Sequence, residues 1–353
     1  VNFSKVVGVN NLSLGFMLGS DWKNWRDSSI LRGLARDANS KLVRLFSHSV
    51  EPCTYSLEPC TYWNESTNSG AFNWTNVDTV VQGICEISAE PFFVLGRRTH
   101  QVVNIIPSGM AVNPNTSLPY PDSWAAYCKE WVKHFKEKGV PVRFYEIFNE
   151  PMSYFGWDNY TRLANFMAVF DAAAQAMRTE NPNIMVSFDG TNRKPVLDYW
   201  LANGGADLDF ISFHKYDAYT IGQHSDEVML NRAESLQLET SPFAYYGIQD
   251  VRQTYYDARG KWIPVINSES NFNSAYKTGT DPKIQRMIGA TWTALVLRMG
   301  ILKGLRYNIY FQFASSTSWE QASKPSGGLG FGMINSDNCK PWYPYHVQRT
   351  LGS

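Results

Sequence analysis

The chain has 353 residues, 44% of them hydrophobic and 14% aromatic, so it can bury a large core and exceeds the usual size of a sandwich or bundle domain. Its 32 basic residues balance 32 acidic ones, which argues against a nucleic-acid surface or an acidic membrane as partner. No apolar run approaches the ~20 residues that span a bilayer. One large barrel and two ordinary domains are the remaining options.

Apolar runs typical of strands alternate with helical patterns along the whole chain. Eight runs are predicted as strands, over residues 5–10, 41–46, 91–96, 142–148, 184–189, 209–216, 264–269 and 305–311. No linker or charge block divides them, so we expect one catalytic domain over residues 1–353. The alternation favours parallel strands joined by helical crossovers, most economically a (β/α)₈ TIM barrel. The alternative, a doubly wound open sheet, normally has a Gly-rich phosphate turn after its first strand, and "GVNNLSLG" is not one.

Two of the intervening helices have recognisable capping or stop signals at their ends. The first is predicted to begin with Asp122 or Ser123 as its N-cap and to end at Gly139. The second, "YTRLANFMAVFDAAAQAMRTENP", keeps apolar residues on one face and is predicted to stop at Asn181, because Pro182 follows.

The five cysteines show no spacing typical of a zinc site, so we expect neither a metal nor another cofactor. Cys53 and Cys60 lie in the duplication "EPCTYSLEPCTYW", where a disulfide closing the short loop is preferred and free thiols are the alternative. The low charged fraction of 18% favours export, as a secreted glycoprotein. Asn-x-Ser/Thr acceptors, which support the same expectation, occur at Asn2, Asn11, Asn64, Asn73, Asn115 and Asn159.

Polar residues end several of the predicted strands, and in a barrel the site lies at these C-terminal ends. They are Arg44 on the second run with His48 after it, Asn149 and Glu150 ending the fourth, His214 and Tyr216 on the sixth, and Glu269 ending the seventh.

Side chains of a strand point alternately to its two faces, and this parity separates the two glutamates of "FYEIFNEP". On the fourth run it directs Glu146, Phe148 and Glu150 inward, with Glu150 at the mouth and Glu146 about 6 to 7 Å deeper. The depth of Glu146 favours a structural role, paired with a neighbour such as Arg44. On the sixth run the same parity directs Ser212, His214 and Tyr216 inward and Ile211 and Phe213 outward.

A carboxylate at the mouth of strand four facing another at strand seven is the arrangement that breaks a glycosidic bond. One carboxyl protonates the leaving oxygen, and the other, ionised, attacks the sugar carbon. A separation of about 5 to 5.5 Å gives double displacement with retention. Glu150 and Glu269 could instead be ordinary acids at helix starts, where the positive helix end favours them.

The motifs "YEIFNEP" and "FISFHKY", with a lone glutamate ending the seventh strand, resemble the retaining β-glycosidases of glycoside hydrolase clan A. The resemblance runs over nearly the whole chain and is strongest to family 39 and its family 5 relatives. It implies Glu150 as general acid/base, Glu269 as nucleophile and Asn149 as the ligand of the sugar 2-hydroxyl.

The same resemblance implies roles for further side chains. Tyr216 would hydrogen-bond the nucleophile and keep it ionised, His214 would line the subsite, and Arg44 would hold the nucleophile's charge. Trp319 is the candidate floor beneath the reacting sugar. His48 and Trp157 are further candidates for substrate binding, with solvated or self-packed loop residues as their alternative reading.

The expected function is therefore a secreted, monomeric, retaining β-glycosidase acting on a plant-type polysaccharide, with an endo-β-1,4-glucanase as the first candidate. An exo-acting β-xylosidase or another family-39-like glycosidase is the nearest alternative. A non-catalytic carbohydrate-binding barrel is the alternative class, which loss of either carboxylate would have supported.

Overall fold

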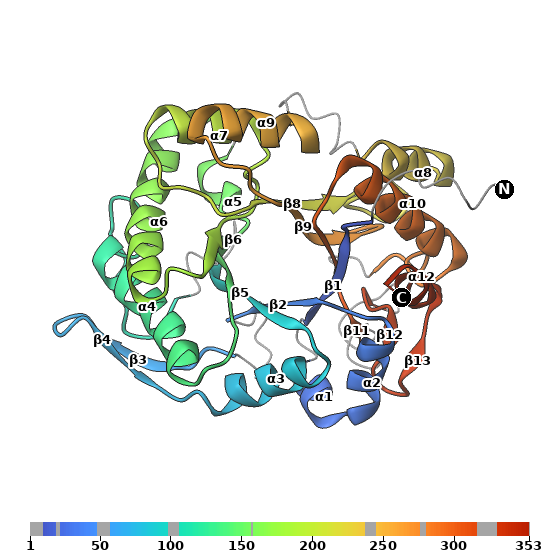
Figure 1. Ribbon diagram of the computed structural model, residues 1–353, viewed down its shortest axis with the longest axis horizontal. Coiled ribbons are helices and arrows are strands. Elements are labelled where there is room, and N and C mark those ends of the chain that lie inside the picture. Colours follow the sequence, from blue (N-terminus) through green and yellow to red (C-terminus); the bar gives the residue numbers. More distant parts are fainter. Residues whose placement is uncertain are drawn as a thin grey trace.

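The computed structural model describes residues 10–18, 22–47, 57–97, 106–156, 158–236, 245–275, 280–315 and 330–352. Within them, eight parallel strands form one sheet in the order β7-β6-β5-β2-β1-β10-β9-β8. The strands are β1 (Ser13–Leu18), β2 (Leu42–Phe46), β5 (Glu90–Arg97), β6 (Phe144–Asn149), β7 (Met185–Ser187), β8 (Ile211–Tyr216), β9 (Val265–Asn271) and β10 (Tyr307–Tyr310). This ring confirms the predicted (β/α)₈ barrel (Figure 1).

The sheet closes at a seam between its two end strands, β7 and β8. Asp189, just past β7, forms a parallel bridge with Ser212, and the N–H of Gly190 donates to the carbonyl of Ser212 at 3.0 Å. Side chains add to this seam, because the hydroxyl of Ser187 donates to the carbonyl of Phe210 at 2.6 Å. The backbone pairing between these two strands is short, and side-chain hydrogen bonds add to it in closing the ring.

The first barrel strand differs from the prediction. It is β1, over Ser13–Leu18, and not the run over residues 5–10, of which only Asn10 is described. Composition does not separate the two runs, because both are apolar and contain a glycine. In the observed strand the backbone packs closely on β2, where a Cβ on Gly15 would lie 2.3 Å from the carbonyl oxygen of Leu42. The other predicted strands all overlap barrel strands.

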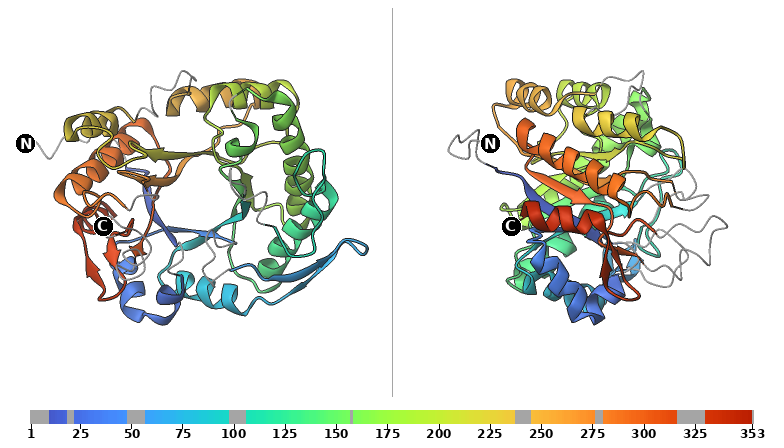
Figure 2. Two further views of the ribbon diagram at one scale, coloured as in Figure 1. Left: turned by 180° about the vertical axis from the view of Figure 1, so that it is seen from behind. Right: turned by 90° about the vertical axis from the view of Figure 1, so that its right-hand side faces the viewer.

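Helices cover the outside of the ring, as the views in Figure 2 show. They are α1 (Trp22–Asp27), α2 (Ser29–Asp37), α3 (Thr75–Glu86), α4 (Pro121–Glu137), α5 (Met152–Phe155), α6 (Tyr160–Glu180), α7 (Lys194–Ala202), α8 (Asp226–Ser235), α9 (Ile248–Arg259), α10 (Met287–Lys303) and α12 (Tyr343–Gly352). Among the described helices, none is long and apolar enough to cross a bilayer.

The predicted C-terminal ends are confirmed for both helices, since Gly139 follows the C-cap Lys138 of α4 with φ 67°, whereas the predicted N-cap of α4 is corrected. Helix α6 ends at Glu180 and has Asn181 as its C-cap. Helix α4 has Tyr120 as its N-cap, so Asp122 and Ser123 lie inside the first turn. The hydroxyl of Ser123 instead donates to the carboxylate of Glu65 at 2.7 Å, which explains why it does not cap the helix.

Two layers of side chains fill the barrel interior between the N-terminal ends of the strands and the C-terminal mouth. The layer near the N-terminal ends is apolar and consists of Met17, Leu42, Phe92, Phe144, Phe210, Ile266 and Ile309. Two residues further along the second, fourth, sixth and seventh barrel strands, the inward positions are polar and buried, and they hold Arg44, Glu146, Ser212 and Ser268. The apolar layer is thus followed by a polar one, and the polar side chains lie directly beneath the mouth of the barrel.

The inward parity predicted for β8 is confirmed, whereas for β6 it fails at Phe148. This ring points out of the barrel and stacks on Trp124 of α4, with centroids 4.7 Å apart. The backbone explains the failure, because Phe148 has φ 61° and Glu150 has φ 48°, both in the left-handed region that interrupts strand alternation.

Smaller sheets surround the barrel. The hairpin of β3 (Cys60–Asn64) and β4 (Ser69–Phe72) extends from its rim (Figure 2), and β11 (Ala314–Ser315), β12 (Ile334–Asn335) and β13 (Lys340–Pro341) form a second sheet. Cys60 is a buried free thiol that donates to the carbonyl of Tyr62 at 3.5 Å. The expected disulfide is therefore not formed by Cys60, and Cys53 lies outside the described residues.

Candidate active site

The predicted site residues that the structure describes lie together at the C-terminal mouth of the barrel. They are Arg44 on β2, Asn149 at the end of β6 with Glu150 after it, His214 and Tyr216 on β8, and Glu269 on β9. His48, Trp157 and Trp319 lie outside the described residues, so their expected contacts with substrate stay predictions.

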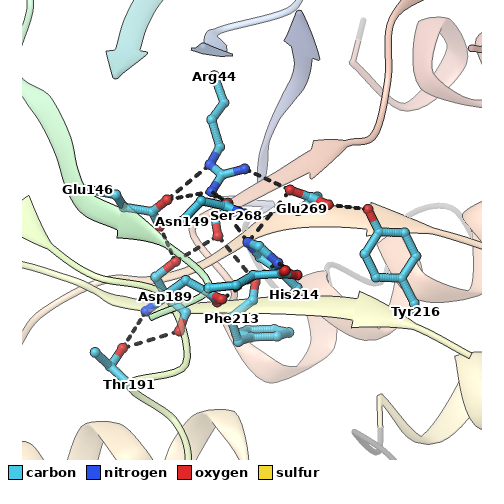
Figure 3. Close-up of polar contacts among 12 residues, drawn as sticks. Arg44, Glu146, Asn149, Asp189, Thr191, Phe213, His214, Tyr216, Ser268 and Glu269 are labelled. Carbon is cyan, nitrogen blue, oxygen red and sulfur yellow. Dashed lines mark hydrogen bonds and ion pairs between the residues drawn. The ribbon is translucent and has the colours of Figure 1, made fainter. Parts of the chain in front are cut away.

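Arg44 is the fully buried centre of the site and lies between two glutamates (Figure 3). Its Nη1 donates to Oε2 of Glu269 at 2.9 Å, and its Nε and Nη2 donate to Oε2 of Glu146 at 3.0 and 2.7 Å. Nη2 also donates to Oδ1 of Asn149 at 2.8 Å. Burial alone would lower the pKa of Arg44, but Glu146 and Glu269 outweigh it and raise that pKa. The predicted pairing of Glu146 with Arg44 is confirmed.

Glu269 reaches the mouth because β9 is irregular. Between Asn308 and Tyr310 of β10, the paired residues on β9 advance from Asn267 to Ser270, so β9 carries one extra residue. Such a bulge re-aims a side chain, as bulges beside active sites commonly do. The carboxylate of Glu269 is buried, with a residue exposure of 7%.

Tyr216 holds the other oxygen of Glu269. Its hydroxyl donates to Oε1 of Glu269, on the side away from Arg44 (Figure 3). Burial and the neighbouring carboxylate of Glu269 raise the pKa of Tyr216 well above its usual value, so the phenol keeps the proton that it donates. With Arg44 donating to one oxygen and Tyr216 to the other, the carboxyl group of Glu269 is fixed in orientation.

Asn149 and Glu150 are adjacent in sequence, yet both take part in the site. A regular strand would send them to opposite faces. The left-handed conformations of Phe148 and Glu150 remove that restriction, so Asn149 meets Arg44 while Glu150 reaches His214. The side chain of Glu150 is 43% exposed, which makes it the accessible carboxyl of the site.

His214 lies between the carboxylates. Its Nδ1 is 3.1 Å from Oε1 of Glu150 and 3.6 Å from Oδ2 of Asp189, and its Nε2 is 3.8 Å from Oε2 of Glu269. Burial lowers the pKa of His214, but Asp189, Glu269 and Glu150 outweigh it and raise the pKa to about 9. The ring is therefore an imidazolium at neutral pH.

Asp189 is the site residue that the sequence analysis missed. It ends the run predicted as the fifth strand, so an acid at the C-terminal end of a buried barrel strand was the available signal. It is 1% exposed. Burial raises the pKa of Asp189 to about 7, against the lowering effect of His214.

Oxygens or nitrogens of Glu150, His214 and Glu269 lie within 4.8 Å of one another, a spacing that a metal ion could use. Arg44 opposes a cation there, because its guanidinium is 2.9 Å from the same Glu269 carboxylate. The arrangement suits proton transfer and nucleophilic attack instead: one carboxyl is accessible and beside an imidazolium, and the other is buried and oriented by Arg44 and Tyr216.

The comparisons with known proteins agree with this geometry. A family model described as Glycosyl hydrolases family 39 matches residues 33–313. A monomeric β-xylosidase from Caulobacter crescentus has a TM-score of 0.64 at 15% identity, covering 97% of this chain and 68% of its own. The GH39 enzyme from Xanthomonas axonopodis pv. citri has a TM-score of 0.65 at 15% identity, covering 97% of this chain and 65% of its own.

A shorter solved structure is also similar. The cellulose synthase subunit Z from Clostridioides difficile has a TM-score of 0.55 at 11% identity, covering 96% of this chain and 98% of its own. No curated protein matches the chain. At these identities the solved structures share the fold, while the family model covers the segment from α2 to just beyond β10.

Proposed function

The chain belongs to glycosyl hydrolase family 39 and is a glycoside hydrolase, and from this premise we propose that it cleaves β-glycosidic bonds by double displacement. Glu269 is the nucleophile and Glu150 the general acid/base. The observation that carries the proposal is that oxygens of the two carboxyls lie within 4.8 Å of each other across the mouth. This closeness favours retention over inversion, which needs about 6.5 to 9.5 Å between the carboxyl groups for an intervening water.

The two roles follow from the surroundings of each carboxyl. A nucleophile must be ionised and fixed, and Glu269 accepts from Arg44 and from Tyr216. An acid/base must meet both the leaving group and an incoming water, and Glu150 is the exposed member of the pair.

In the first step, Glu150 gives its proton to the glycosidic oxygen while Oε of Glu269 bonds to the anomeric carbon, and the C–O bond to the leaving group breaks. In the second step, Glu150 takes a proton from water, whose oxygen displaces Glu269 from the sugar. Asn149 accepts from Arg44 through Oδ1, and its NH₂ group would then donate to the sugar 2-hydroxyl.

For the substrate, we propose a β-xyloside as the first candidate, because the β-xylosidase from Caulobacter crescentus shares the fold of this chain. An endo-acting β-1,4-glucanase is the second candidate. Tyr62 of the hairpin and Tyr219 after β8 are 57% and 52% exposed, and such rings suit stacking on an extended glycan. Export, glycosylation and the monomeric state stay predictions.

The test compares wild type, Glu150→Ala and Glu269→Ala on aryl β-xylosides, xylan and soluble cellulose derivatives. Glu130→Ala on α4, outside the site, is the control and should keep full activity. Azide should rescue Glu269→Ala with an inverted glycosyl azide and Glu150→Ala with a retained one. Full activity of Glu269→Ala on every substrate would refute the proposal, and the best substrate decides between the two candidates.

A further inference from the structure

Asp189 is a buried carboxyl group to which the steps above give no role. It follows β7 and is 1% exposed. Among the described residues, neither of its side-chain oxygens has a hydrogen-bond partner. Buried carboxylates are normally hydrogen-bonded, so a group left without such partners calls for an explanation. Its backbone has a structural task, the bridge to Ser212, but that bridge does not require a carboxylate.

Among the charged groups around Asp189, His214 forms an ion pair with it. The His214 Nδ1 is 3.6 Å from Oδ2 of Asp189. Arg193 also attracts the carboxylate, whereas Glu146 and Glu150 repel it. Burial and these two carboxylates disfavour the charged form of Asp189, whereas His214, Arg193 and the guanidinium of Arg44 favour it.

His214 in turn connects Asp189 to the acid/base. The same Nδ1 that faces Asp189 is 3.1 Å from Oε1 of Glu150. On the opposite edge, Nε2 is 3.8 Å from Glu269 and 3.4 Å from Nη2 of Arg44. A ring with negative groups on both edges is favoured in its charged form, and Arg44 is the only opposing cation among the groups that these contacts join.

We propose that Asp189 is a positioning residue for general acid catalysis: it keeps His214 charged and turned towards Glu150. The inference rests on the proposed role of Glu150. When Glu150 gives its proton to the leaving oxygen, it becomes a carboxylate beside the imidazolium Nδ1–H, which stabilises that new charge. Without Asp189, the pKa of His214 should fall, and the ring should stabilise the new charge on Glu150 less well.

The ionisation of the pair agrees with this role. Burial lowers the pKa of His214, and among the groups that raise it Asp189 acts most strongly, followed by Glu269 and Glu150. The resulting pKa is about 9. Replacing Asp189 by a neutral side chain removes the strongest of these contributions, so the pKa of His214 should fall.

The test uses Asp189→Asn, with Asp171→Asn as a matched control. Asp171 is a half-buried carboxyl of α6 that accepts from the N–H of Ala206 at 2.8 Å, outside the site. Glycosides with leaving groups of graded acidity separate acid catalysis from other effects, because dinitrophenyl glycosides leave without a proton. Asp189→Asn should lose about ten- to hundredfold in kcat/KM on poor leaving groups and less than about threefold on dinitrophenyl glycosides. Asp171→Asn should change neither.

Two further measurements separate this inference from the proposed function. Nuclear magnetic resonance titration of His214, identified by its loss in His214→Gln, should give a pKa at least about one unit lower in Asp189→Asn. In the His214→Gln background, Asp189→Asn should have little additional effect. Asp189→Ser gives a second neutral variant if the asparagine variant does not fold.

An equal loss on every leaving group, or an unchanged His214 titration, would overturn the role of Asp189. If Glu150→Ala itself shows no dependence on the leaving group, the proposed function fails instead, and the titration still reports on the pair.

Discussion

The buried pair of Arg44 and Glu146 offers a quantitative test of how the barrel interior is stabilised. The perturbation is Glu146→Gln, which keeps the shape of the side chain and removes its charge. Both partners are fully buried, and Oε2 of Glu146 accepts two N–H groups of Arg44. The other oxygen accepts from the hydroxyl of Ser212, which can rotate to receive the new amide.

The expected loss of unfolding free energy depends on the partners that Arg44 retains in the variant. Removing one partner of a buried ion pair usually costs about 3 to 5 kcal/mol, because the remaining charge stays buried without compensation. Here Arg44 retains Glu269 at 2.9 Å. The glutamine oxygen can also still accept from the guanidinium. We therefore expect the lower end, a loss of about 3 kcal/mol in the free energy of unfolding.

Urea unfolding measures this loss, and the chain supplies a matched control. Glu90 accepts from Nε and Nη2 of Arg143 at 2.6 and 2.7 Å, one on each oxygen, so the same two arginine nitrogens donate to a glutamate, but the arginine side chain is 51% exposed. Glu90→Gln should cost at most about 1 kcal/mol, since water screens that pair. If Glu146→Gln costs no more than Glu90→Gln, the argument that burial makes the inner pair indispensable is wrong.

Three further predictions concern the site and the strand packing. Tyr216→Phe should lower kcat on an aryl glycoside about ten- to hundredfold, because Glu269 loses a charge-assisted hydrogen bond worth about 1.5 to 3 kcal/mol; unchanged kcat would contradict this. The pKa of His214 is raised from 6.5 to about 9, so its stabilisation is complete below pH 6.5 and is lost as pH rises through 9. The gap in unfolding free energy between wild type and His214→Gln should then shrink by about 3 kcal/mol from pH 6 to pH 9.5 in urea unfolding, and a constant gap would refute it. Gly15→Ala should sharply lower the melting temperature, because the new Cβ would lie 2.3 Å from a backbone carbonyl oxygen. Gly33→Ala in α2, where nothing lies within 4 Å of the new Cβ, should raise the melting temperature slightly. Equal shifts in the two variants would disprove the packing argument.

Strand periodicity was sufficient to predict the inward positions of β8. Ser212, His214 and Tyr216 all face the barrel interior, because that strand keeps its alternation to its end. The pairing of Glu146 with Arg44 was predictable for the same reason, since both lie in the regular part of their strands.

The irregular strand ends were not predictable. Periodicity assumes an extended backbone, and Phe148 leaves it with φ 61°, so that its ring packs on α4. The bulge that brings Glu269 inward depends on pairing with β10, a strand about forty residues away in the sequence. Asp189 was overlooked because it has no motif around it: its significance comes from the distance to His214, which only the closed barrel defines.

The short pairing between β7 and β8 has a consequence for the motions of the barrel. Strand β7 has three residues, so this is the place where the ring can open at the least cost, before the core unfolds. We expect amide protons at Gly190 and Thr191, which donate to the carbonyl of Ser212, to exchange with solvent sooner than those in β6 or β9. Each such opening would carry Asp189 away from His214, so on warming the enzyme should lose turnover before it loses its fold.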